Sequence, residues 1–212
     1  MSKKAANAPT MRKRPYPPMF DDTYFKPAPE VLAWIDTEIL AEGGALHNPD
    51  HKHLLDADLG ILWAADGYAS KMRTVVGTAE QVAFRCSAWQ KLRQEEQMVG
   101  WFGRVPDFVI TLDAKYAANA PDIAWCALVE HELYHIAHVK GAFDEPMFTK
   151  DGKPKLGIQS HDVEEFVGVV RRYGTGHPEG ALARLVAAAK SAPEVSNASL
   201  SGACGTCLRL VA

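Results

Sequence analysis

The stretch ALVEHELYHIAHV, residues 127–139, places two histidines four residues apart in an apolar run, with Glu132 directly after the first. Residues i and i+4 of a helix share one face, with Cβ atoms about 5–6 Å apart, so His131 and His135 can point at a single metal ion. Glu132 lies one residue further round the helix, where it reaches a metal-bound water more easily than the ion. This is the H-E-x-x-H arrangement, in which the glutamate acts as general base.

The flanking residues distinguish a metal site from a solvated helix face, on which the same three residues can also occur. Between Ile123 and Val139, Glu130 is the only Asp, Glu, Lys or Arg besides Glu132. Burying ionisable groups in so apolar a helix is costly unless they are paired or bind a metal. The pattern therefore favours a metal centre, and a catalytic zinc typically has protein ligands of this kind and one open position.

Two histidines are too few for a catalytic zinc, which usually has three protein ligands. The longer pattern H-E-x-x-H-x-x-G-x-x-H is absent, because position 138 is His where that pattern needs Gly and position 141 is Gly where it needs His. His138 lies nearly a full turn beyond His135 and is poorly placed to share the ion. We therefore expect the third ligand to come from a later element.

That element is SHDVEEF, residues 160–166. Asp162 and Glu165 have the spacing of a capping box, which gives both acids a structural role and leaves His161 just before the helix, free to aim its ring. Imidazole also suits zinc well. We favour His161 as the third ligand, with Glu165 as the alternative.

Composition limits the class of protein. The chain has 212 residues, 47% of them hydrophobic, and a net charge of −3, which suits one domain with tails and gives no indication of nucleic-acid binding. Its four cysteines do not make a disulfide framework in a chain of this length. No apolar run approaches the roughly 20 residues that span a bilayer, and the N-terminus lacks the hydrophobic segment of a secretory signal. We expect a cytoplasmic protein without a membrane partner; the sequence does not define its oligomeric state.

The chain divides by composition into three regions. The composition predicts that residues 1–28 form a disordered, basic, Pro-rich arm, that residues 29–190 form the folded domain, and that residues 191–212 form a flexible tail. A basic arm can contact nucleic acid, but a solubilising role is favoured and no nucleic-acid partner is expected.

Hydrophobic periodicity and turn residues predict a mixed α+β fold. The expected elements are a helix at 29–42, strands at 59–64, 71–76 and within 105–116, a helix starting at Thr78, the metal helix from Pro121 to about Lys140, a hairpin at 142–160 and helices at 163–173 and from about Pro178.

Three segments together, DFVITLD (107–113), ALVEHELYHI (127–136) and HDVEEFVGVVRRYG (161–174), resemble the putative phage metallopeptidase family of bacteriophages and prophages. The resemblance covers roughly residues 50–175. It implies a small zincin-like domain, with a few-stranded sheet packed against an active-site helix. It also implies that strand 107–113 lies beside that helix, where a peptide can add to its edge. His131, Glu132 and His135 carry over directly, and His161 with less certainty.

The predicted activity is zinc-dependent hydrolysis of a peptide or protein substrate. His131, His135 and His161 hold the zinc, and Glu132 moves the proton. The alternative is a zinc-containing binding or regulatory module that cleaves nothing. A closed site with a fourth ligand, for example Glu165 or His138, would support that alternative.

Overall fold

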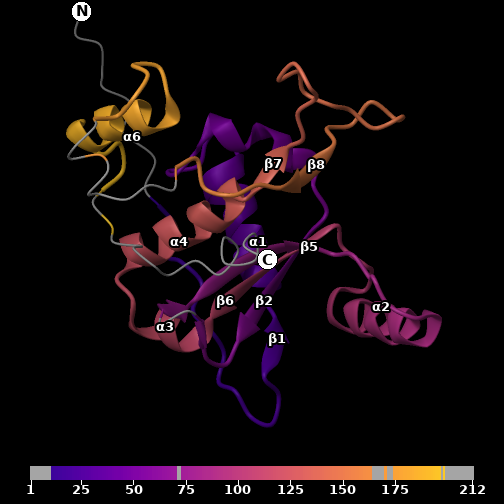
Figure 1. Ribbon diagram of the computed structural model, residues 1–212. Helices are drawn as coiled ribbons and strands as arrows, with labels where there is room; N and C mark the ends of the chain where they lie inside the picture. The colour runs from indigo at the N-terminus through magenta and orange to yellow at the C-terminus, as the bar shows by residue number, and fades with distance from the viewer. Residues whose placement is uncertain (1–10, 71–72, 164–169, 171–173, 197, 199–212) are drawn as a thin grey trace, which may run out of the picture.

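The computed structural model describes residues 11–70, 73–163, 170, 174–196 and 198, and it has the predicted mixed α+β architecture (Figure 1). The predicted helix at 163–173 lies largely outside the described residues, and Glu165 lies wholly outside them.

A four-stranded mixed sheet, in the order β1-β2-β6-β5, forms the centre of the molecule. The two inner strands, β2 (Leu59–Ala64) and β6 (Phe108–Asp113), are parallel, with Leu59 opposite Phe108. All six residues of β2 are buried, as expected for a continuous apolar run covered on both faces. The outer strands, β1 (Phe25–Pro27) and β5 (Gly77–Gln81), are antiparallel to their neighbours. The strand predictions for 59–64 and 105–116 are therefore confirmed.

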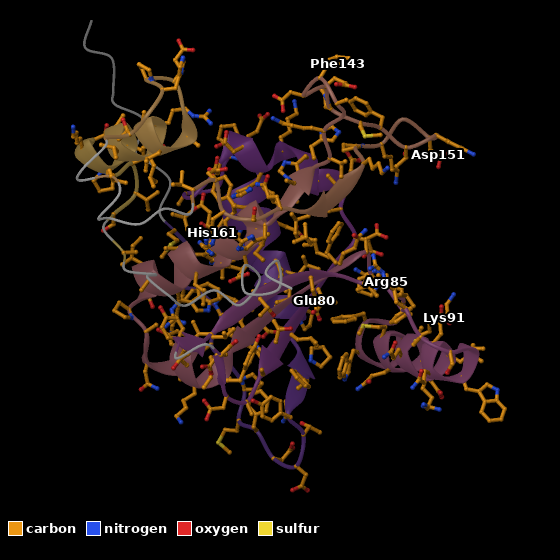
Figure 2. All side chains as sticks on the ribbon, in the orientation of Figure 1. Glu80, Arg85, Lys91, Phe143, Asp151 and His161 are labelled. Carbon is orange, nitrogen blue, oxygen red and sulfur yellow. The ribbon has the colours of Figure 1, made fainter. Side chains whose placement is uncertain are left out.

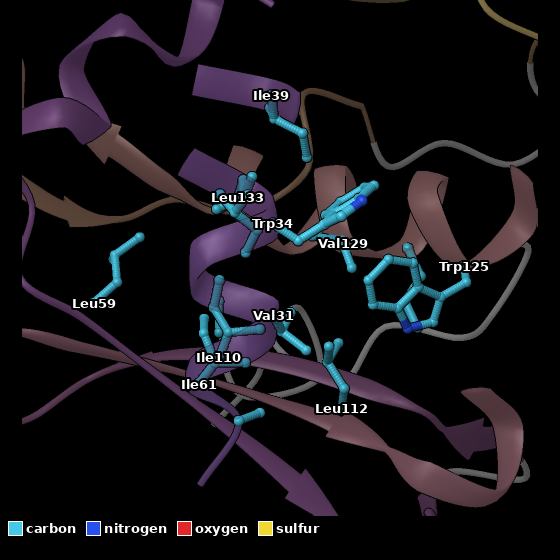
Figure 3. Close-up of a cluster of buried hydrophobic side chains, with 14 of the residues drawn as sticks. Val31, Trp34, Ile39, Leu59, Ile61, Ile110, Leu112, Trp125, Val129 and Leu133 are labelled. Carbon is cyan, nitrogen blue, oxygen red and sulfur yellow. The ribbon is translucent and has the colours of Figure 1, made fainter. Parts of the chain in front are cut away.

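Two helices cover one face of this sheet (Figure 3). α1 (Pro29–Ile35) begins at a proline, which suits the first helical turn, and continues as a π-helical turn over Asp36–Leu40. α4 (Asp122–Tyr134) lies beside it, and the rings of Trp34 and Trp125 pack edge to face with centroids 5.0 Å apart. The described core residues that have no exposed surface are Ala28, Val31, Ile35, Ile39, Trp63, Ile110, Leu112, Ala117, Trp125, Val129, Leu133 and Ile136.

The remaining described elements are short or peripheral. They are a 3-10 helix (Pro49–Asp56), β3 (Tyr68–Ser70), β4 (Arg73–Val75), α2 (Ala88–Phe102), α3 (Ala114–Asn119), β7 (Ile136–His138), β8 (Leu156–Ile158) and α6 (Ala181–Lys190). Among the described residues, none of the helices combines the length and the hydropathy that a membrane span requires.

The helix predicted from Thr78 is wrong. Residues Gly77–Gln81 form strand β5, and α2 begins only at Ala88, where Gln90 accepts a hydrogen bond from the backbone N–H of Ser87 at 3.2 Å. The Thr78 to Gln81 spacing imitates a helix cap, but pairing of this segment with β6 overrides that local signal. α2 projects from the body of the fold, and Trp89, expected on its inner face, is 79% exposed.

The metal helix is shorter than expected. α4 ends at Tyr134, not near Lys140, and Ile136–His138 forms β7, which pairs antiparallel with β8. The predicted hairpin is confirmed, and its strands extend back to Ile136. Gly152 has a φ of 77° at the distal turn, a left-handed conformation that favours glycine.

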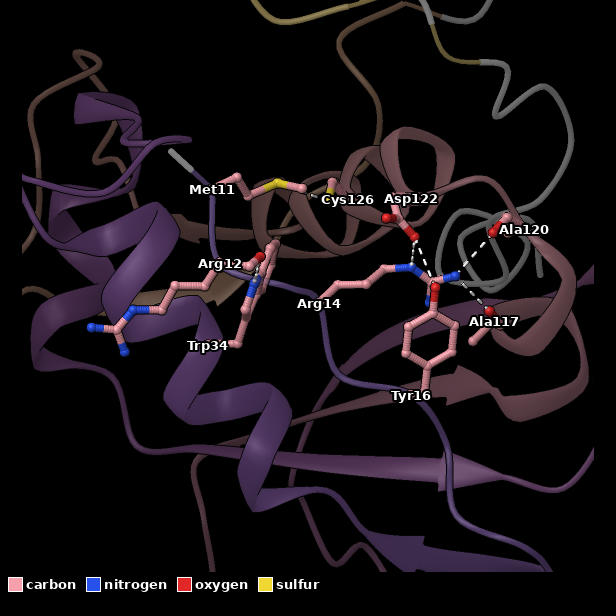
Figure 4. Close-up of polar contacts among 9 residues, drawn as sticks. All are labelled: Met11, Arg12, Arg14, Tyr16, Trp34, Ala117, Ala120, Asp122 and Cys126. Atoms are coloured by element: carbon pink, nitrogen blue, oxygen red, sulfur yellow. Dashed lines mark hydrogen bonds and ion pairs between the residues drawn. The ribbon is translucent and has the colours of Figure 1, made fainter. Parts of the chain in front are cut away.

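Residues 11–28, which we expected to belong to a disordered arm, pack onto the domain, whereas residues 1–10 lie outside the described residues (Figure 4). The Arg14 side chain is 1% exposed. Its Nε donates to Asp122 Oδ1 at 2.6 Å, and its Nη2 donates to the carbonyls of Ala117 and Ala120 at 3.0 and 2.9 Å. These hydrogen bonds satisfy the carbonyl end of α3 and tie the N-terminal segment to the start of α4. The bond from Arg14, followed by one from Tyr16, holds the pKa of Asp122 below its ordinary value.

Replacing Arg14 by Ala should therefore destabilise the protein by about 2–3 kcal/mol, because two helix-end carbonyls lose a buried charged donor. Urea unfolding followed by circular dichroism measures the change. Lys13→Ala is the matched control, since Lys13 is exposed and its loss should cost no more than about 0.5 kcal/mol. Equal stability of the two variants would show that the N-terminal segment does not brace the fold.

Candidate metal centre

Three histidines converge at the C-terminal end of α4. His131 lies in its last turn, His135 is its C-cap, and His161 follows β8. One ring nitrogen from each lies within 4.8 Å of the others. The Nε2 atoms of His131 and His161 are 3.1 Å apart, close enough for an N–H···N hydrogen bond. Two nitrogens bound at 2.0–2.1 Å to one tetrahedral zinc would be roughly 3.3 Å apart, so this spacing fits a shared ion.

His135 keeps its helical relation to His131 although the helix ends one residue earlier. Its φ and ψ are −68° and −20°, still right-handed helical, and the two rings have centroids 5.0 Å apart. His135 is 2% exposed, His131 is half-buried and His161 is exposed. The group therefore has one side in the protein core and one side open to solvent.

Gln159 connects the β7–β8 hairpin to the end of α4. Its backbone N–H donates to His135 O, and its Nε2 donates to Tyr134 O, both at 2.8 Å. Its carbonyl lies 2.8 Å from His135 Nδ1, which must carry the proton because a carbonyl only accepts. His135 Nε2 is thereby left as the nitrogen that can bind a metal, a common support for ligand histidines. Sequence reasoning missed Gln159, because its position depends on the register of the hairpin.

The hairpin also explains how His161 reaches the helix. The chain leaves α4 through β7, turns, and returns through β8, so that residues 159–161 lie again beside the end of the helix. Figure 2 shows His161 over α4, with Phe143 and Asp151 far from it at the tips of the hairpin.

Glu132 occupies a different place from the three histidines. Its side chain has no exposed surface, and it points from α4 toward β5, with its carboxylate near Gly77. Its oxygens do not belong to the group of converging ligand atoms found among the described residues. Glu132 is therefore not one of the converging groups, and its role in proton transfer stays a prediction.

His138 does not join the group. It belongs to β7, its Nε2 lies 2.6 Å from Met147 O, and its ring meets Phe148 edge to face. A closed site with His138 as fourth ligand therefore does not form. Glu165 lies outside the described residues, so the preference for His161 over Glu165 stays a prediction.

A polar network holds the outer side of the same helix end. Asn48 Nδ2 donates to Glu130 Oε1 at 2.6 Å and to the Tyr134 hydroxyl at 2.9 Å, and that hydroxyl donates to Asp50 Oδ2 at 3.1 Å. Burial opposes ionisation of Glu130, but hydrogen bonding with His51 and Asn48 lowers its pKa overall. Burial raises the pKa of Tyr134. The end of α4 is thus braced by segment 48–51 on one side and by Gln159 on the other.

A cleft of about 360 Å³ opens beside the histidines. This volume lies at the lower end of the range that is typical of small-molecule binding sites. Its walls come from the end of α4, from the chain after β8, and from Leu185 of α6. The lining residues are His131, Tyr134, His135, Gln159, Ser160, His161, Asp162, Val163 and Leu185.

Comparison with known proteins gives one match. The model of a family described as "Putative phage metallopeptidase" matches residues 32–190, which include α4, the hairpin and all three histidines. No curated protein and no solved structure matches the chain.

His161→Ala should remove a metal ligand. The wild-type protein should carry about one zinc per chain. The variant should lose more zinc affinity than the roughly 10–100-fold that is typical when an outer hydrogen-bond partner of a ligand is removed. Metal analysis and competition with a chromogenic chelator measure both. His138→Ala is the matched control, because this histidine bonds to Met147 and should not affect zinc. Loss of zinc in Glu165→Ala, with full binding in His161→Ala, would identify the acid as the ligand.

Proposed function

Because the chain belongs to the putative phage metallopeptidase family, we propose that it is a zinc-dependent metallopeptidase that hydrolyses peptide bonds in a peptide or protein substrate. The observation that carries the proposal is the convergence of His131, His135 and His161 beside a cleft at the end of a buried helix. Family membership alone supports a peptidase at a coarse level, and the histidine geometry supports the metal.

The donor set favours zinc among the common metals. Imidazole suits zinc, whereas calcium and magnesium prefer oxygen ligands. Three protein ligands leave a position open, as catalytic zinc sites do. When bound here, zinc would supply Lewis-acid activation of water and of the scissile carbonyl. The His135 ring is held for this by Gln159, and the exposed His161 closes the group from the solvent side.

Glu132 is the residue to which we assign proton transfer. As general base it accepts a proton from the attacking water, and as general acid it delivers that proton to the leaving nitrogen. Its carboxylate is buried between α4 and β5.

The cleft indicates what kind of substrate side chain fits next to the metal. Leu185 and Tyr134 line it and remain 52% and 44% exposed. Covering such apolar surface contributes about 25 cal/mol per Å². Among the described lining residues there is no Lys or Arg, whereas Asp162 is present. We therefore propose that the substrate places an apolar side chain, and not an acidic one, in this cleft.

The strand that lies beside the active-site helix is β5, not 107–113. β6, which contains that segment, is hydrogen-bonded on both sides, to β2 and β5, and so has no edge that a peptide can extend. The earlier expectation of peptide addition to strand 107–113 is therefore wrong.

Glu132→Gln tests the mechanism. The amide is nearly isosteric but accepts no proton at neutral pH, so zinc content and fold should persist while the rate falls by about 10²–10⁴-fold. The assay is cleavage of a peptide library by both proteins, with and without chelator.

Undiminished cleavage by the glutamine variant would sink the assignment of Glu132. Zinc binding without cleavage of any peptide by the wild type would favour a zinc-containing binding or regulatory module instead.

Leu185→Asp tests the apolar cleft. The compound 4-methylpentanohydroxamate carries a metal-binding group and an uncharged apolar chain, whereas acetohydroxamate carries the metal-binding group and a single methyl. The zinc-loaded protein should bind 4-methylpentanohydroxamate more tightly, and the variant should lose that advantage while binding acetohydroxamate unchanged. Isothermal titration calorimetry measures both affinities.

Leu92→Asp, at a 60% exposed leucine on α2, is the matched control and should behave as wild type. Equal affinity of the wild type for both compounds would refute the apolar cleft. Absence of binding by either compound would count against the metal site itself.

A further inference from the structure

Gly77, the first residue of β5, lies directly against the side chain of Glu132. A Cβ placed on Gly77 would be 2.6 Å from Glu132 Oε1, 3.0 Å from Leu128 Cδ1 and 3.1 Å from Glu132 Cδ. The first of these distances is shorter than nonbonded atoms tolerate. Every residue other than glycine would therefore compete with Glu132 for the same space.

Backbone conformation does not explain this glycine. Among the described residues, the glycines with positive φ are Gly103, Gly152, Gly174 and Gly176, and Gly77 is not one of them. Glycine within a strand weakens the strand, but it also occurs where another group approaches the backbone closely. Here the approaching group is the carboxylate to which we assign proton transfer.

We propose that Gly77 is a positioning residue for Glu132: its missing side chain creates the space in which the buried carboxylate is held against β5. The catalytic consequence rests on the proposed function, but the contact itself does not. Gly77 pairs with Leu112 of β6, so the strand backbone is anchored. The carboxylate is the movable end of a side chain, and it should yield first when a methyl group is added.

The chain offers a matched control on the other face of the same sheet. Gly60 of β2 is also buried, and a Cβ there would meet the Phe102 ring at 2.8 Å. Gly60 is opposite Val109 and Gly77 is opposite Leu112, three residues further along β6. Because successive side chains alternate in a strand, the two glycines face opposite sides of the sheet. Gly60→Ala therefore perturbs the packing of β2 against Phe102 of α2 without touching Glu132.

A double-mutant cycle on thermal stability tests the contact without any assay of activity. Gly77→Ala should lower the midpoint of thermal unfolding in the wild-type background. In the Glu132→Ala background it should lower the midpoint clearly less, because the carboxylate no longer occupies the space beside Gly77. Gly60→Ala should lower it equally in both backgrounds. Equal losses for Gly77→Ala in both backgrounds would overturn the proposal. If Gly77→Ala folds only together with Glu132→Ala, the contact is supported; if it folds in neither background, the proposal fails.

Zinc content and kinetics then test the positioning role. Gly77→Ala should retain zinc and KM for a cleaved peptide while kcat falls, approaching the about 10²–10⁴-fold loss of Glu132→Gln. Gly60→Ala should keep kcat. Unchanged kcat in Gly77→Ala would refute the role. Absence of peptide cleavage by the wild type would refute the proposed function but leave the stability coupling intact, so the two failures are distinguishable.

Discussion

The burial of α4 against the sheet is the interaction on which the candidate site depends. Trp125, Val129 and Leu133 repeat every four residues and have no exposed surface, so they set the rotation of the helix about its axis. Once this rotation is set, each neighbouring position has a defined direction. Glu132 follows Leu128 on the core side and points at β5, whereas His131 and His135 lie at the border of the core and face the cleft. The packing of one helix face therefore directs the proposed base toward β5 and the proposed ligands toward the cleft.

The end of α4 is held in place by contacts on both sides. Gln159 bonds to the carbonyls of Tyr134 and His135, and Asn48 bonds to Glu130 and the Tyr134 hydroxyl. The two bonds from Gln159 replace helical hydrogen bonds that the last carbonyls lose where the helix stops, and those from Asn48 hold side chains of the last turns. The same hairpin that brings Gln159 to the helix also brings His161, so helix termination and completion of the histidine group have one structural cause.

The geometry also bears on the choice between an enzyme and a binding module. A structural zinc site is usually closed by four protein ligands, whereas a catalytic one keeps a position open. The group found among the described residues has three histidines, and the nearby His138 is engaged by Met147 O instead of turning toward it. The group borders a cleft with exposed apolar side chains, as expected for a substrate site.

The features that the sequence by itself determined are those with a local signal. Hydrophobic runs identified β2 and β6, the H-E-x-x-H spacing identified the helix that carries His131 and His135, and turn residues within 142–160 identified the hairpin. His161 was chosen by ligand chemistry from several candidates, and the fold brings it to the other two histidines.

Other features arise only when distant segments meet. The segment after Gly77 becomes a strand through pairing with β6, Arg14 is buried by the carbonyl end of α3, and α4 stops where β8 pairs with its continuation. The space at Gly77 and the bond from His135 to Gln159 likewise exist only in the folded chain. Local propensities cannot reveal such features, because the free energy that decides them comes from burial and hydrogen bonding between residues far apart in sequence.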